Sequence, residues 1–83
     1  MKFIADITIM PLEELLDPQG KAVNRSLSTL GMNQIKDVRI GKHLRIQVEA
    51  ADRGEAENII QKACDQLLVN KVMESVDFQL KEA

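Results

Sequence analysis

Apolar residues recur at every second position in four parts of the chain, which is the spacing of a β-strand with one buried face. The first strand is predicted over residues 2–10 and the second over residues 35–40. Residues 44–48 and 72–80 repeat the alternation. Between the second and third strands we expect a tight hairpin at Gly41-Lys42, because glycine supplies the positive φ that short turns need. The predicted inward positions are Phe3, Ala5, Ile7, Ile9, Val38, Ile40, Leu44, Ile46, Val48, Val76, Phe78 and Leu80.

Two other segments carry apolar residues three and four positions apart, which predicts amphipathic helices. The first covers residues 18–30, between an N-cap at Asp17 and a terminating Gly31. The second follows a capping box formed by Asp52 and Glu55. Its apolar stripe, up to a left-handed stop predicted at Asn70, comprises Ala56, Ile59, Ile60, Ala63, Cys64, Leu67 and Leu68.

The resulting order, β-α-β-β-α-β, predicts one fold for the chain. Two helices and four strands share one core only when both helices cover the same sheet face, and right-handed crossovers then fix the topology. We therefore predict an α+β, ferredoxin-like two-layer sandwich, with a four-stranded antiparallel sheet and two helices on one face. It forms a single domain of residues 1–83. The other sheet face is polar and carries Asp6, Thr8, Arg39, Arg45, Gln47, Asp77 and Gln79.

Composition argues against several classes of partner. The net charge of −2 and two aromatic residues, Phe3 and Phe78, disfavour nucleic-acid binding, which needs a basic surface and stacking side chains. No apolar run is long enough for a membrane span or a signal peptide. A single cysteine excludes an intrachain disulfide and a multi-cysteine zinc site. We expect a cytoplasmic protein with no nucleic-acid or membrane partner.

Few residues suggest a catalytic or ligand-binding role. No carboxylate is paired by sequence with the only histidine, His43, so a solvated histidine is favoured over a general base. Cys64 lies on an apolar stripe, which favours a buried structural thiol. Residues 11–16 contain two glutamates and no glycine, unlike a phosphate-binding loop. A group of basic residues surrounds the predicted hairpin. It fits either a solvated edge hairpin or a patch that binds an anion or a partner. The group comprises Lys36, Arg39, Lys42, His43 and Arg45.

The most informative stretch is Leu16–Val23, with the sequence LDPQGKAV. Asp17 and Pro18 suit a helix start, but glycine inside a helix costs about 1 kcal/mol relative to alanine. Gly20 therefore suggests that another backbone or a partner comes close to it.

Three blocks together resemble the PurS family, the small subunit of bacterial and archaeal phosphoribosylformylglycinamidine synthase. They are Leu16–Val23, the sequence VRIGK at Val38–Lys42, and LLVNKVME at Leu67–Glu74. The resemblance extends from the first strand to about Leu80. One departure is Lys71, where the family commonly has proline, which loosens the predicted turn.

The resemblance implies a non-catalytic role in purine biosynthesis. It implies a complex that converts formylglycinamide ribonucleotide, glutamine and ATP to formylglycinamidine ribonucleotide. In that complex a PurQ-type glutaminase releases ammonia, and a PurL-type large subunit uses it in the ATP-dependent amidation. The PurS subunit is needed for assembly and helps ammonia pass between the other two. The resemblance also implies a homodimer or homotetramer. No cofactor is expected in this chain, since ATP, magnesium and glutamine are used by the partner subunits.

We expect two segments to face protein partners, with no catalytic or metal-binding residue among them. Asp17 and Gln19 would make polar contacts, and Gly20 and Gly41 would allow close approach of a partner's backbone. Arg39 and Lys42 would pair with charges on the partner. The alternative is that Asp17 only caps its helix and Arg39 only solvates the sheet. The sequence leaves two other functions open. An ACT-like small-molecule sensor is disfavoured because residues 11–16 contain no glycine, and a small hydrolase is disfavoured because no nucleophile is paired with a base.

Overall fold

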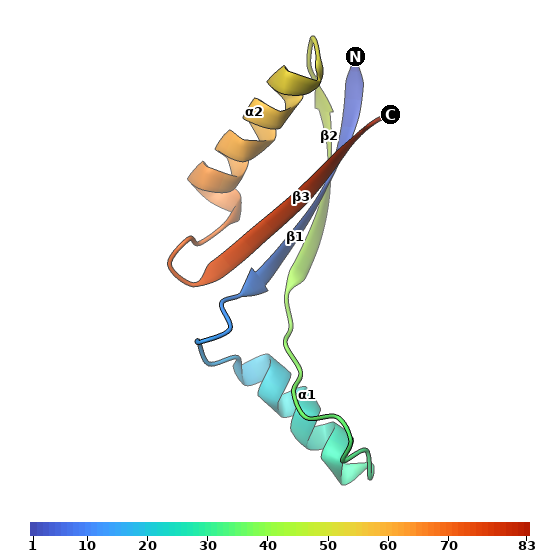
Figure 1. The fold of residues 1–83 in the computed structure, drawn as a ribbon, viewed down its shortest axis with the longest axis vertical. Coiled ribbons are helices and arrows are strands. Elements are labelled where there is room, and N and C mark those ends of the chain that lie inside the picture. Colours follow the sequence, from blue (N-terminus) through green and yellow to red (C-terminus); the bar gives the residue numbers. More distant parts are fainter.

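The computed structural model describes residues 1–83 and confirms an α+β chain with an antiparallel sheet and two helices (Figure 1). The central strand is β1, in the order β2-β1-β3. A π-helical turn, η1, continues the second helix. The elements in chain order are β1 (Lys2–Pro11), α1 (Pro18–Thr29), β2 (Lys42–Glu49), α2 (Arg53–Ala63), η1 (Cys64–Leu68) and β3 (Glu74–Glu82).

The core lies between one face of the sheet and α2. In the register of the sheet, Ala5 is opposite Ile46 on one side and Leu80 on the other, so the apolar positions of all three strands share a face. Helix α2 packs Ala56 and Ile60 against this face. The buried hydrophobic residues are Phe3, Ala5, Ile7, Ile9, Ala50, Ala56, Ile60, Cys64, Val69 and Leu80. The predicted inward positions of these three strands are confirmed at Phe3, Ala5, Ile7, Ile9 and Leu80.

The predicted strand at residues 35–40 and the hairpin at Gly41-Lys42 are wrong for the single chain, whose sheet has three strands and not four. Residues 35–41 are extended but pair with no strand, and β2 already begins at Lys42. Gly41 lacks the positive φ of a two-residue hairpin turn, since only Gly31 has one, and no turn is present at residues 35–41. The alternation of apolar residues at 35–40 correctly predicts an extended segment, but no strand of the single chain pairs with it.

Helix α1 does not cover the sheet, so the expectation of two helices on one face is also wrong for the single chain. Figure 1 shows α1 beyond the end of the sheet, with the following extended segment running back beside it. We call residues 18–40 the arm. Gly20 is the only buried residue of α1. The radius of gyration is 16.5 Å, against about 12 Å for a compact chain of this length.

Both ends of α1 are as predicted. Asp17 is the N-cap, and its carboxylate accepts a hydrogen bond from the Gly20 amide. Gly31, at φ 88°, follows the C-cap. Its amide donates to the Ser28 carbonyl, and the Met32 amide donates to the Leu27 carbonyl. These two bonds form a Schellman motif, in which glycine accepts the left-handed conformation at little cost.

The end of α2 differs from the prediction. Because η1 is π-helical, with the Val69 amide bonded to the Cys64 carbonyl, the chain gains about one residue per turn there. This change turns Val69 into the core and leaves Leu67 85% exposed. The predicted left-handed stop at Asn70 is also wrong, since no residue other than glycine has a positive φ.

No helix of the structure is both long and apolar enough to span a membrane.

The shift in register at η1 can be tested with two truncations. Ile60 is 1% exposed, so Ile60→Ala should lower the free energy of unfolding by about 2–5 kcal/mol. Leu67→Ala should change it by less than about 0.5 kcal/mol, because Leu67 packs on almost nothing. Urea unfolding followed by circular dichroism measures both. A loss at Leu67 as large as at Ile60 would contradict the observed end of α2.

Candidate partner-binding site

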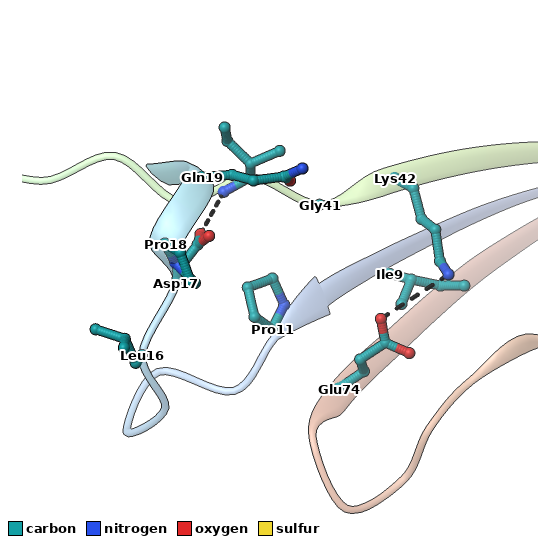
Figure 2. A pocket seen from close by; sticks show the side chains of 10 residues that line it. Ile9, Pro11, Leu16, Asp17, Pro18, Gln19, Gly41, Lys42 and Glu74 are labelled. Carbon is teal, nitrogen blue, oxygen red and sulfur yellow. Dashed lines mark hydrogen bonds and ion pairs between the residues drawn. The ribbon is translucent and has the colours of Figure 1, made fainter. Parts of the chain in front are cut away.

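The candidate site is an open hollow of about 350 Å³ where the arm joins the sheet (Figure 2). It is walled by the end of β1, the start of α1, the residues before β2 and the first residue of β3. Four of the six predicted partner-binding residues line it, namely Asp17, Gln19, Gly41 and Lys42. The other two, Gly20 and Arg39, are not among its lining residues.

Asp17 joins the two chain segments that form the base of the arm. One carboxylate oxygen accepts from the Gly20 amide at 3.0 Å, and the other accepts from the Ile40 amide at 2.8 Å. These backbone donors, Gly20 first and Ile40 second, lower the pKa of Asp17 from its ordinary 3.8, and the positive charge of Arg39 adds to the effect. The residue is buried. Its carboxylate is therefore committed to its own chain, and the role extends beyond the N-cap that the sequence predicts.

Arg39 holds the connection between β1 and α1. Its guanidinium donates to the carbonyl oxygens of Leu12 at 2.5 Å, Leu15 at 3.2 Å and Pro11 at 3.4 Å. Solvation of the sheet, the alternative offered by the sequence, does not describe this arrangement, and pairing of Arg39 with a partner stays a prediction. Carbonyl groups leave no trace in the side-chain pattern, so the sequence could not reveal these acceptors.

Gly20 is required by the chain's own backbone. A Cβ atom at this position would overlap the carbonyl oxygen of Val38 and would lie 2.9 Å from its carbonyl carbon. The close approach inferred from the sequence is present, but the neighbour is the extended segment of the same chain. Gly41 is similar, since a Cβ there would overlap the Ile9 carbonyl oxygen. Gly20 is buried in the single chain, and its contact with a partner stays a prediction.

The accessible polar groups of the hollow are Gln19 and Lys42. Both residues are exposed. The Lys42 ammonium on β2 lies 3.9 Å from the Glu74 carboxylate on β3, so the pair spans the end of the central strand β1. Figure 2 shows this pair beside Pro11 and Ile9, with Gln19 on the opposite side. The hollow can thus offer an amide, a cation and an anion around an apolar floor. Glu74 is a site residue that no single-residue signal in the sequence predicts, although it ends the third block of the family resemblance.

His43, the candidate general base, lies away from the hollow. His43 meets Asp6 across the sheet, with Nε2 3.2 Å from Oδ1, and its Nδ1 is 3.4 Å from the Thr8 hydroxyl. Arg45 donates to the same Asp6 oxygen at 2.7 Å and is the main cause of the lowered pKa of Asp6. This group lies on the exposed sheet face and lines no cavity.

Cys64 is 1% exposed, and burial raises the pKa of its thiol, as suits a structural cysteine. No group of three or more His, Cys, Asp or Glu side chains is arranged to hold a metal ion.

Comparison with known proteins identifies the family. The PurS family model, described as phosphoribosylformylglycinamidine (FGAM) synthase, matches residues 4–82. This chain belongs to the PurS family. The phosphoribosylformylglycinamidine synthase subunit PurS of Bacillus subtilis is 37% identical over 70 residues, covering 84% of this chain and 82% of the relative. The PurS subunit of Archaeoglobus fulgidus is 38% identical over 79 residues, covering 95% and 99%.

Solved structures agree with the family. A chain in the structure of PurLQS from Thermotoga maritima matches with a TM-score of 0.89 at 31% identity, covering 98% of this chain and 99% of that one. The match to PurS over almost the whole chain favours a PurS subunit over an ACT-like sensor or a hydrolase.

The three blocks that resemble PurS converge on the hollow. Leu16–Val23 supplies the start of α1, Val38–Lys42 supplies the segment before β2, and Leu67–Glu74 supplies the edge at Glu74. Lys71, the departure from the family pattern, forms an ion pair with Asp65 at 2.8 Å. This ion pair supports the turn before β3. Residues that are far apart in sequence thus form one surface.

The role of Gly20 can be tested by adding a single methyl group. Gly20→Ala should lower the free energy of unfolding by about 2 kcal/mol, because the Val38 carbonyl must move away. Gly54→Ala is the matched control near the start of α2, where the nearest atom is 3.4 Å from the added Cβ. That variant should be unchanged or more stable, by up to about 1 kcal/mol. Equal effects of the two substitutions would contradict the close contact.

The Asp17 bonds predict a local response to acid. A lowered pKa means that this contribution to stability is present above about pH 4 and is lost as the pH falls through the folded-state pKa. NMR titration should show the Gly20 and Ile40 amide signals moving together at that lower pH, as the two bonds weaken. Asp17→Asn should abolish this shared titration. Independent titration of the two amides would exclude a shared carboxylate acceptor.

Proposed function

We propose that this chain is the small, non-catalytic subunit of phosphoribosylformylglycinamidine synthase in purine biosynthesis. The observation that carries the proposal is the convergence of the three PurS blocks on one hollow, where they supply contact groups and no paired nucleophile and base. The family match over residues 4–82 supports the same conclusion. The chain would work in the cytoplasm.

The partners we propose are a PurL-type synthetase subunit and a PurQ-type glutaminase subunit. Their support is the likeness to a chain of PurLQS from Thermotoga maritima. In this complex the chain assists assembly and, through assembly, the transfer of ammonia. ATP, magnesium and glutamine are bound by the partner subunits, and this chain supplies no ligand to them.

The hollow is the proposed contact surface within the complex. Gln19, Gly41 and Lys42 can reach a partner because they are exposed. Asp17, Gly20 and Arg39 would act indirectly, by fixing the shape of the hollow. The site hypothesis therefore separates into three contact residues and three residues that shape the surface.

We also propose that the chain forms a homodimer or homotetramer, and that the four-stranded, ferredoxin-like sandwich is completed only in such an assembly. The single chain leaves an extended segment unpaired and α1 away from the sheet.

Charge reversal at the hollow tests the assembly role. Lys42→Glu should weaken formation of the complex with PurL- and PurQ-type subunits by about tenfold or more, because it places like charges beside Glu74. Lys62→Glu, on exposed α2, makes the same change in net charge away from the hollow and should assemble normally. Size exclusion with glutamine and ADP, together with glutamine-dependent synthesis of the amidine product, measures both. Normal assembly of Lys42→Glu would exclude the hollow as the contact surface, and no assembly of the unchanged chain would overturn the function itself.

A further inference from the structure

A second hollow lies on the arm, where α1 and the extended segment run beside each other (Figure 1). Its volume is about 430 Å³, and all of its lining residues are polar or charged. They are Lys21, Asn24, Arg25, Lys36 and Asp37, and we call this space the arm hollow. It shares no residue with the hollow at the base of the arm. Three cations and one carboxylate thus surround a separate open space.

The three cations of the arm hollow have no partner within the chain. None of them forms an ion pair, although Asp37 lies on the same hollow. Lys36 is also the only member of the basic group identified in the sequence whose side chain binds nothing in the chain. The other four bind carbonyl oxygens or carboxylates. An anion-binding role, one of the two interpretations of that group, is therefore still open to Lys36.

The positive charges of the arm hollow repel one another in the free chain. Lys21 and Arg25 are four residues apart on α1, so they lie on the same face of the helix, and like charges at this spacing destabilise a helix. Lys36 adds a third charge from the extended segment. The whole arm carries a net charge of +3, with four basic residues against Asp37 alone, in a chain of net charge −2. A bound anion would relieve this repulsion, and the field of the arm would attract one.

Asn24 adds a polar side chain with an unused hydrogen-bonding group. Its Oδ1 atom is buried and has no hydrogen-bond partner. Such an atom is unusual, because burial removes its bonds to water without replacing them. Since no bond to this oxygen holds the carboxamide in place, the group can rotate and donate its NH2 to an acceptor in the arm hollow.

We propose that the arm hollow binds the phosphate group of a small, hydroxylated phosphate monoester, such as a sugar phosphate. Lys21, Arg25 and Lys36 bind the phosphate oxygens through charge-assisted hydrogen bonds, and the Asn24 amide donates to the same group. Asp37 accepts from a neighbouring hydroxyl. The four charged side chains together carry +2, which matches the charge of about −2 on a phosphate monoester near pH 7. The proposal is independent of the PurL- and PurQ-type partners.

The lining of the arm hollow favours a small anion over a macromolecule. The centres of protein–protein interfaces are depleted in charged residues, whereas this hollow has no apolar residue. Single-stranded nucleic acids stack on aromatic side chains, and both aromatic residues of the chain, Phe3 and Phe78, belong to the sheet. The volume is within the range of small-molecule sites, about 300–1000 Å³.

Titration of the full-length chain with ribose 5-phosphate tests the site. In NMR spectra near pH 7, with about 150 mM salt, saturable shifts are expected at the amides of residues 21–25 and 36–37, and ribose should cause none. Lys36→Gln should weaken binding by about fivefold or more, because one charge-assisted bond is lost. Lys62→Gln, the matched control on exposed α2, should bind within about twofold of the unchanged chain. No saturable shift up to about 10 mM, or equal losses in both variants, would overturn the site.

Inorganic phosphate as a second ligand tests the role of Asp37. The unchanged chain should bind ribose 5-phosphate about threefold or more tightly than inorganic phosphate, because the sugar offers hydroxyl donors to the Asp37 carboxylate. Asp37→Ala removes the same negative charge for both ligands but removes the hydroxyl acceptor for the sugar phosphate alone. The ratio of the two dissociation constants should therefore fall to about one. A ratio that the substitution leaves unchanged would overturn the assigned ligand class.

An acidic surface of a partner protein is the alternative occupant of the arm hollow. Failure of Lys36→Gln to assemble with PurL- and PurQ-type subunits, in a chain that binds no ribose 5-phosphate, would show such a surface and overturn the proposal. Normal assembly of this variant, together with weakened binding of the sugar phosphate, would support the proposal. Because assembly and ligand binding are measured separately, failure of this site is distinguishable from failure of the proposed function.

Discussion

The carboxylate of Asp17 is the constraint on which the shape of the molecule depends. It binds the first turn of α1 with one oxygen and the backbone just before β2 with the other. The chain therefore leaves the sheet after β1 and returns to it at β2 through a fixed junction. A carboxylate that accepts two buried backbone donors is strongly favoured in its charged form. The bonds of Arg39 to the carbonyl groups between β1 and α1 hold the same junction from the other side of the chain segment.

Local features of the fold could be predicted from the sequence, because they depend on neighbours in the chain. The cap at Asp17, the Schellman glycine at Gly31 and the alternation of β1 need only residues a few positions apart. The strand at 35–40 is a different case. Its alternation is real, but pairing depends on another segment, and the single chain turns this segment toward α1. Periodicity identifies an extended strand without identifying its partner.

In the candidate site, too, the sequence predicts the local feature but not its distant partner. Glycine at position 20 could be recognised as a sign of close approach, since its helix cost is otherwise unexplained. The identity of the neighbour, the Val38 carbonyl, could not be recognised, because backbone atoms carry no sequence information. The bonds of Arg39 to three carbonyl groups were hidden for the same reason. The π-helical turn at η1 places Leu67 at the surface, although regular helical spacing predicts it inside.

A rigid junction and a projecting arm suit a subunit that joins other proteins. The core of ten buried residues is small for a chain of this length, and a small core alone gives modest stability. Much of the apolar surface of α1 is consequently available to an assembly rather than used within the single chain. Asp17 and Arg39 bind backbone atoms of their own chain, so these two charged groups hold the junction between the arm and the sheet. Residues of the three blocks that resemble the PurS family thus line the hollow that we propose as the contact surface.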